Sequence, residues 1–388
     1  GWHFYNNAEF WKDPQTKALL GSVPNGRMIV LDLHCEHRPT WETTQSFYGN
    51  PWIWCIIQSF GDQVSLHGGL PQIAANLNKA MTSAERGKLV GTGCIMEGLG
   101  WNPVVYDLMN DLMWQPSNLD LEEWISRFAA RRYGVHHERA AQAWRQLLET
   151  AYSQPRQIGS ILCKRPRLDL GGTNKSTHLP YSAETLRNAC QNLVDAADAL
   201  KEISTYQYDV VHLTRQVLCN RAGSIYDDVV AAFESGDQEK LEVAGARLLE
   251  LMADLDTLLA TREEFLLGRW LEDAKRWGTD ADETRLYEWN ARNQITLWGP
   301  RDSVLHDYAA KQWSGLMRGF YRPRWEQFVQ GLREALEDGV PFDAESFETR
   351  IRSWEEQWTR GTEPYATQPA GDPVAISMRM LEKYATAL

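Results

Sequence analysis

The sequence predicts two regions of different fold class, an α/β region over residues 1–115 and an all-α region over residues 116–388. In the first region, three nearly continuous apolar runs alternate with helix-like stretches, which is typical of parallel strands buried on both faces. In the second, glycine-poor segments repeat apolar residues at spacings of three and four, which is typical of packed helices. The chain has 388 residues and 43% hydrophobic content, which is enough for two cores.

The apolar runs of the first region are residues 27–33, 52–57 and 88–93, and a helix-like stretch at 71–81 separates the last two. Three parallel strands by themselves would leave unpaired edges on both sides. A closed (β/α)8 barrel requires eight strands. The pattern therefore predicts that further strands belong beside these three, supplied by an upstream segment or by another chain.

The second region carries apolar stripes that we interpret as packing between antiparallel helices, without a cofactor site among them. The clearest stripe consists of Leu241, Ala244, Leu248, Leu251, Leu255 and Leu258. Asp372 followed by Pro373 predicts the N-cap and the first residue of the last helix. Residues 158–180 combine Gly, Pro, Lys, Arg and Asn and predict a long loop.

Composition excludes some classes of function. The formal net charge of -12 argues against a general nucleic-acid binder, which needs a basic surface. The sequence contains no run of 18 apolar residues, so it predicts no membrane span. The 6 cysteines form no CxxC pair and are interpreted as buried thiols. The 17 Trp residues suggest a few sugar-stacking rings, because flat aromatic faces suit the apolar faces of sugars, while most of them should pack in cores.

Two short motifs resemble cofactor or metal sites but lack essential parts. The segment GTGCIM at 91–96 begins like a dinucleotide fingerprint, but Met96 replaces the third glycine. The segment HCEH at 34–37 has no second group of ligands at a matching spacing. We therefore predict neither a cofactor nor a metal.

Two carboxylates, Glu36 and Glu97, lie just beyond the ends of predicted strands. Catalytic groups of (β/α)8 barrels project from the carboxyl ends of the strands. The small residues around Glu97, in GCIMEGLG at 93–100, would let a substrate approach closely. From this context alone, an ordinary glutamate in a surface loop remains the alternative.

The segment GTGCIMEGLGWNPVVYDLM at 91–109 resembles the nucleophile segment of the α-N-acetylglucosaminidases of glycoside hydrolase family 89. The resemblance covers essentially the whole chain, in order. The other matching segments are GW at 1–2, VPNGR at 23–27, LDL at 31–33, PWIWC at 51–55, FAARRYG at 128–134, FLLGRW at 265–270, TLWGP at 296–300 and YRPRW at 321–325.

The resemblance implies the end of a (β/α)8 TIM barrel over residues 1–115, followed by an all-helical domain over residues 116–388. It implies a retaining exo-glycosidase that removes terminal α-linked N-acetylglucosamine by means of two glutamates. Glu97 matches the nucleophile, while the general acid belongs to an earlier strand whose segment is absent, so the chain alone should be an incomplete enzyme. The implied substrate-binding residues are Trp2, Trp54, Trp298, Tyr308 and, as an apolar wall, Val304, and Glu36 is expected to hold sugar hydroxyls or to support the site.

The expected partner is a glycan with terminal α-N-acetylglucosamine, as in glycosaminoglycan degradation, and the sequence leaves homo-oligomerisation open. The family implies a secreted, periplasmic or lysosomal protein. One segment departs from the family, which usually reads LHNFGGN where this chain has IQSFGDQ at 57–63. The competing hypothesis is a non-catalytic carbohydrate-binding relative or an inactive fragment.

Overall fold

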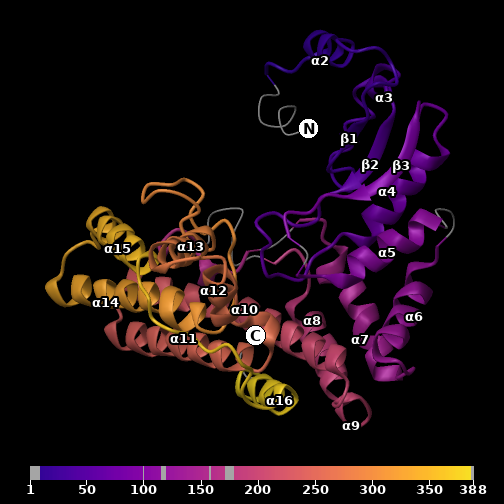
Figure 1. The fold of residues 1–388 in the computed structure, drawn as a ribbon. Helices are drawn as coiled ribbons and strands as arrows, with labels where there is room; N and C mark the ends of the chain where they lie inside the picture. The colour runs from indigo at the N-terminus through magenta and orange to yellow at the C-terminus, as the bar shows by residue number, and fades with distance from the viewer. Residues whose placement is uncertain (1–8, 99, 115–118, 157–158, 171–178, 386–388) are drawn as a thin grey trace.

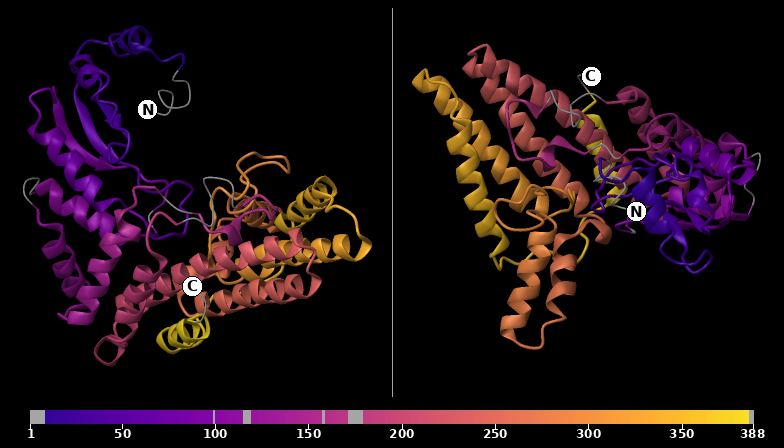
Figure 2. Two further views of the ribbon diagram at one scale, coloured as in Figure 1. Left: turned by 180° about the vertical axis from the view of Figure 1, so that it is seen from behind. Right: turned by 90° about the horizontal axis from the view of Figure 1, so that it is seen from above.

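The computed structural model describes residues 9–98, 100–114, 119–156, 159–170 and 179–385 (Figure 1). It combines a small parallel sheet with a large set of helices. The sheet and the helices around it lie at the indigo and magenta end of the chain, and the long orange and yellow helices lie beside them (Figures 1 and 2). This arrangement agrees with the predicted order of an α/β region followed by an all-α region.

The sheet has three parallel strands in the order β1-β2-β3, namely β1 (Val30–Asp32), β2 (Trp52–Ile56) and β3 (Leu89–Cys94). Helix α4 (Leu70–Thr82) connects β2 to β3, and α5 (Pro103–Trp114) follows β3. The three predicted strands and their parallel direction are thereby confirmed. Closure into an eight-stranded barrel stays a prediction.

The two faces of the sheet differ in how they are covered. Because side chains alternate along a strand, Trp52, Trp54 and Ile56 share one face, and they are buried in one core with residues of α4 and α5. On the other side, the side chain of Leu31 is 43% exposed. In this part of the chain one face is therefore packed against helices, while the other is exposed at Leu31 and covered at Cys55.

Two short helices flank the sheet, α2 (Asp13–Leu20) and α3 (Gln45–Tyr48). The helices that follow α5 are α6 (Leu121–Tyr133), α7 (Glu138–Glu149), α8 (Ala183–Val194), the short α9 (Ala197–Leu200), α10 (Ser204–Glu234), α11 (Gln238–Leu259), α12 (Leu267–Lys275), α13 (Ala281–Gln294), α14 (Arg322–Asp338), α15 (Ala344–Thr359) and α16 (Pro373–Lys383). Among the described residues, no helix is both long and apolar enough to cross a bilayer.

The sequence signals for these helices are confirmed. All six residues of the predicted stripe are buried in α11. Asp372 caps α16, because its carboxylate accepts hydrogen bonds from the backbone N–H groups of Val374 and Ala375. The predicted long loop contains a turn of 3-10 helix at Ile161–Cys163, and residues 158 and 171–178 of it lie outside the described part.

Two apolar cores divide the molecule, and α10 passes through both. Its first half contributes Tyr206, Val210 and Leu213 to a core shared with the sheet and with α4–α8, and its second half packs against α11 and α14. Helices after residue 116 therefore share a core with the strands before it. The predicted domain boundary falls at the end of α5, and it stays a prediction.

Candidate active site

The polar groups that follow the three strands meet at one edge of the sheet, because the strands are parallel. Glu36 follows β1, residues 57–63 follow β2, and Glu97 follows β3. Backbone hydrogen bonds continue the sheet beyond the strand ends: Ile95 donates to the carbonyl oxygen of Ile56 at 2.8 Å and Glu97 to that of Ser59 at 3.1 Å. The backbone at Glu97 is thus anchored to the loop after β2.

The Glu97 side chain is exposed, and one of its oxygens receives two hydrogen bonds. The backbone N–H of Gly61 donates to Oε2 at 2.6 Å, and the hydroxyl of Tyr308 donates to the same atom at 2.7 Å. Burial, together with the hydrogen bond to Glu97, raises the pKa of Tyr308 above its usual value, so the phenol keeps its proton and acts as the donor. Both bonds hold Oε2 of the Glu97 carboxylate in place.

Gly61 is required at its position for two reasons. Its φ of +65° lies in the left-handed region, and a Cβ there would be 2.6 Å from the carbonyl oxygen of Tyr308. The neighbouring Asp62 and Gln58 also have positive φ, at 51° and 55°. Non-glycine residues adopt such backbone conformations at a cost, and they cluster at functional sites.

Tyr308 and Trp298 belong to a loop between α13 and α14 that reaches the loops at the end of the sheet. Their rings pack edge to face with centroids 5.0 Å apart. The Trp298 backbone N–H donates to the carbonyl oxygen of Asn293, whose side chain binds both the N–H and the carbonyl oxygen of Gly299. Asp307 donates from its backbone to Thr296 at 2.7 Å. The loop is therefore closed by its own hydrogen bonds.

A buried ion cluster fixes the residue before Tyr308. Arg324 donates to Asp307 at 2.9 Å and to Glu355 at 2.8 Å, and Arg165 donates to Glu355 at 2.6 Å. The backbone N–H of Arg165 also donates to Asp307 at 2.9 Å. Sequence reasoning missed this cluster, although Arg324 lies in a segment, YRPRW at 321–325, that resembles the family.

Glu36 is 2% exposed and supports the loop after β2. Its Oε1 accepts hydrogen bonds from the backbone N–H groups of Ile57 at 3.0 Å and Gln58 at 2.8 Å. Burial raises the pKa of Glu36 to about 7. Of the two roles expected from the sequence, the supporting one fits this geometry, because a buried side chain offers no surface to sugar hydroxyls.

Trp54 and Val304 have no contact with Glu97 in the described part of the chain. Trp54 is fully buried on the sheet face that packs against α4 and α5, so its ring has no surface for a ligand here. Val304 is 90% exposed, in the same loop as Tyr308. Trp2 lies outside the described residues. The structure therefore brings together Glu97, Tyr308 and Trp298, with Glu36 beneath the loop that carries Gly61.

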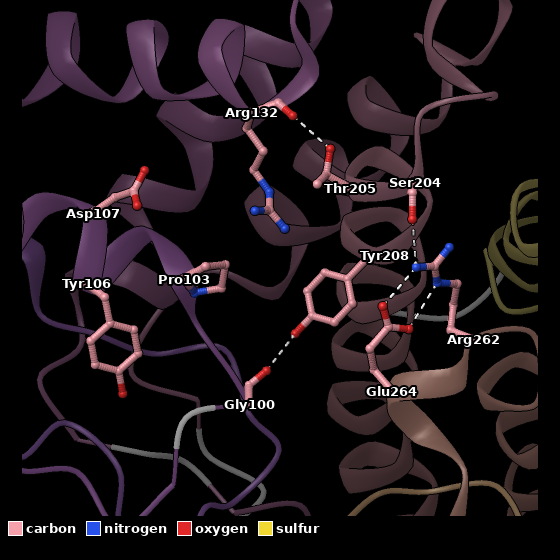
Figure 3. Close-up of a pocket in the computed structure, with 10 residues that line it drawn as sticks. All are labelled: Gly100, Pro103, Tyr106, Asp107, Arg132, Ser204, Thr205, Tyr208, Arg262 and Glu264. Atoms are coloured by element: carbon pink, nitrogen blue, oxygen red, sulfur yellow. Dashed lines mark hydrogen bonds and ion pairs between the residues drawn. The ribbon is translucent and has the colours of Figure 1, made fainter. Parts of the chain in front are cut away.

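The loop after Glu97 inserts into the helices. Trp101 is 4% exposed, and its ring centroid lies 5.1 Å from that of Phe265 and 5.6 Å from that of His212. Tyr208 of α10 donates from its hydroxyl to the carbonyl oxygen of Gly100 at 3.3 Å (Figure 3). The helical region therefore holds this loop at several points besides Tyr308.

A pocket of about 340 Å³ borders the same loop, between α5, α6 and the start of α10 (Figure 3). Its charged side chains have partners: Arg262 binds Glu264 at 2.8 Å and Ser204 at 3.1 Å, and Arg132 binds Asp209. Asp107 also lines the pocket and lies 3.8 Å from Arg131. The charged groups of the pocket thus have partners among the described residues, and Glu97 does not line it.

An exposed carboxylate beyond the carboxyl end of a parallel strand, with aromatic rings beside it, is the arrangement of a glycoside hydrolase that works from a barrel. Comparison with known proteins agrees with this class. Two family models match the chain, the α-N-acetylglucosaminidase (NAGLU) tim-barrel domain over residues 1–116 and the NAGLU C-terminal domain over residues 124–383.

Human α-N-acetylglucosaminidase is 36% identical over 391 residues, which are 99% of this chain and 52% of the human protein. A family 89 glycoside hydrolase from Clostridium perfringens, solved with 2-acetamido-1,2-dideoxynojirmycin, matches with a TM-score of 0.88 and 28% identity over 96% of this chain and 44% of that one. A variant of it with two Glu→Gln changes, solved with its substrate GlcNAc-α-1,4-galactose, matches equally well. This chain spans about half the length of these relatives. The chain belongs to the α-N-acetylglucosaminidase family of glycoside hydrolases.

Proposed function

We propose that this chain supplies the nucleophile of a retaining exo-glycosidase that removes terminal α-linked N-acetylglucosamine from glycans. The observation that carries the proposal is the Glu97 carboxylate, which is exposed while Gly61 and Tyr308 both donate to its Oε2. The solved relative with two Glu→Gln changes, in complex with its substrate GlcNAc-α-1,4-galactose, supports the substrate class.

The proposed chemistry uses the two oxygens of Glu97 differently. Among the described residues both hydrogen bonds go to Oε2, so Oε1 is the atom that attacks the anomeric carbon. The new C–O bond forms as the glycosidic bond breaks, and a general acid protonates the leaving oxygen. Water then displaces the sugar with the same group acting as base, and the net configuration is retained. The two donors favour the carboxylate when it is released in this second step.

The general acid is proposed to lie in a part of the protein that precedes residue 1, as the family resemblance implies. Retaining enzymes hold the two carboxyl groups about 5–5.5 Å apart. Glu36 does not suit this role, because it is buried and its Oε1 is occupied by two backbone N–H groups. Among the described residues β1 and β3 are edge strands, and this supports further barrel strands that would pair beside them.

Trp298 and Tyr308 are proposed to form one wall of the sugar pocket, with Val304 and Trp2 as further contacts from the family resemblance. The partly exposed edge-to-face pair offers aromatic surface beside Glu97. Aromatic rings present apolar surface that suits the C–H faces of a sugar. We do not include Trp54 in this wall, because it is fully buried.

The alternative is a carbohydrate-binding relative without turnover. The observation that favours it is the departure at residues 57–63, where family polar groups have changed. Against it, the loop still delivers the Gly61 N–H to Glu97. Turnover by the full-length gene product decides between the two.

The test replaces Glu97 by Ala in the full-length gene product. Turnover of an aryl α-N-acetylglucosaminide should fall by about 10⁴-fold or more, as expected when a nucleophile is removed. The fold should persist, because an exposed carboxylate contributes little to stability. Azide should restore part of the activity and yield the β-azide, since it attacks from the face that the carboxylate has left.

The matched control is Glu202→Ala, an exposed glutamate before α10, which should leave turnover unchanged. Full activity of Glu97→Ala, or recovery of the α-azide, would show that Glu97 is not the nucleophile. Absence of turnover in the unsubstituted protein would favour the carbohydrate-binding alternative.

A further inference from the structure

The segments that carry the two donors to Glu97 bind each other directly. Gln63, two residues after Gly61, donates from Nε2 to the carbonyl oxygen of Tyr308 at 2.8 Å. Gly61 itself is in contact with that carbonyl group, because a Cβ on it would come within 2.6 Å. The position of one donor is therefore coupled to the position of the other.

An ion pair between a buried lysine and a partly buried aspartate joins the same two segments. Lys311 is 4% exposed, and its ammonium group donates to both the carboxylate and the backbone carbonyl oxygen of Asp62. The ammonium also lies 5.4 Å from the centre of the Trp313 ring. Lys311 thus holds Asp62 through its main chain as well as its side chain, and the residue before Asp62 is Gly61.

Asp62 also borders the loop that carries Glu97. A Cβ added to Gly98 would overlap the carboxyl group of Asp62, so the two residues are in direct contact. Oδ1 of Asp62 is buried without a hydrogen-bond partner in the described part of the chain. Within those same ranges, Lys311 is the cation that pairs with Asp62. Removing Lys311 would leave a partly buried negative charge uncompensated next to the nucleophile loop.

We propose that Asp62 and Lys311 are positioning residues that keep the Gly61 N–H and the Tyr308 hydroxyl on Oε2 of Glu97. The inference rests on the proposed role of Glu97. Asp62 and Gln63 stand where the segment departs from the Gly-Asn of the family resemblance. In this chain the side chains at these two positions, which stand in place of glycine and asparagine, therefore bind the loop to the helical region.

The first measurement is the pH profile of kcat/KM for an aryl α-N-acetylglucosaminide, with Lys311→Met in the full-length gene product. The rate should fall about 10- to 100-fold, because small displacements of reacting groups are costly. The acidic limb should move to higher pH, since the unpaired charge of Asp62 disfavours the ionised form of Glu97. The double variant Asp62→Asn/Lys311→Met lacks both charges, and its acidic limb should return toward that of the unsubstituted protein.

The second measurement does not need turnover. Hydrogen–deuterium exchange of a peptide covering residues 57–64 should be faster in Lys311→Met and in Asp62→Asn than in the unsubstituted protein, because the loop loses an anchor. Lys79→Met is the matched control, since Lys79 forms an exposed ion pair with Glu42 at 2.7 Å on a different part of the sheet region. It should change neither measurement.

Two results would overturn the inference. The first is an acidic limb that is unchanged in both Lys311→Met and Asp62→Asn. The second is an unchanged exchange rate over residues 57–64 in variants whose Tm alone is lower. If Lys311→Met does not fold, Asp62→Asn and the charge-retaining Lys311→Arg carry the test, and Lys311→Arg should keep the acidic limb in place. If the unsubstituted protein shows no turnover, the proposed function fails while the exchange measurement still decides on the ion pair.

Discussion

The ends of β1 and β3 carry the same type of residue in opposite environments. Glu97 is exposed and receives donors from Gly61 and Tyr308, which belong to two distant parts of the chain. Glu36 is 2% exposed and receives two backbone N–H groups from a single loop. Of two glutamates that follow strands of the same sheet, the exposed one is a candidate nucleophile, whereas the buried one holds a loop in place.

The largest effect in this comparison should come from Tyr308→Phe, which removes one donor from Glu97 and keeps the aromatic ring. Loss of a donor that stabilises charge in an active site typically costs about 10²–10³-fold in kcat. The acidic limb of the pH profile should also move to higher pH, because a hydrogen bond to the ionised carboxylate is lost.

Steady-state kinetics over a range of pH checks this expectation. Tyr287→Phe on α13 serves as the control, because its side chain is 38% exposed and does not contact Glu97 in the described structure. If Tyr308→Phe has the kcat and the acidic limb of the unsubstituted protein, Glu97 does not depend on its second donor.

A smaller effect is expected for Trp298→Ala, which removes one of the two rings of the proposed sugar-binding wall beside Glu97. An aromatic contact contributes about 0.5–1.5 kcal/mol beyond its buried area. The KM of the aryl substrate should therefore rise several-fold, up to about tenfold, with a similar loss in kcat/KM.

Trp277→Ala tests whether any exposed tryptophan has this effect, since Trp277 is 76% exposed between α12 and α13. Its KM should match that of the unsubstituted protein. A normal KM for Trp298→Ala together with a lower Tm would assign Trp298 to packing.

The smallest effect on catalysis is expected for Glu36→Gln, which keeps an acceptor oxygen for the loop but cannot ionise. Burial raises the folded-state pKa of Glu36 from 4.5 to about 7. A raised pKa means that the folded state holds the proton more tightly, so this contribution to stability is present below pH ~4.5 and is lost as the pH rises through ~7. The shift corresponds to on the order of 3 kcal/mol.

Thermal unfolding between about pH 5 and pH 8 measures this contribution. The Tm of the unsubstituted protein should fall with rising pH more steeply than that of Glu36→Gln. Equal slopes of Tm against pH would show that ionisation of Glu36 does not destabilise the fold. The difference between the environments of Glu36 and Glu97 would then be smaller than the structure indicates.

Much of the fold could be predicted because it depends on local sequence. Apolar runs identified β1, β2 and β3, and Asp372 identified the start of α16, since strand periodicity and capping are properties of adjacent residues. Glu97 was identified as a candidate from its place beyond a strand and from the resemblance of its segment. The apolar run at 52–57 did not indicate which face of β2 carries Trp52 and Trp54, or that this face packs against helices.

What could not be predicted depends on contacts between distant residues. Asp62 and Lys311 lie 249 positions apart, and no local pattern indicates that they pair. The positive φ angles of Gln58, Asp62 and Asp307 also follow from tertiary contacts, because residues other than glycine seldom adopt that conformation by themselves. The site is thus assembled by long-range contacts around one locally recognisable glutamate.

The insertion of Trp101 into the helical core has a consequence for biosynthesis. Glu97 leaves the ribosome 211 residues before Tyr308, and at roughly 5–20 residues per second that interval lasts about 10–40 s. Throughout it the loop around Glu97 lacks the tyrosine donor, and for most of it the loop also lacks Phe265, which packs against Trp101. The nascent chain therefore carries an unfinished candidate site, and its second donor to Glu97 is present only after residue 308 has been made.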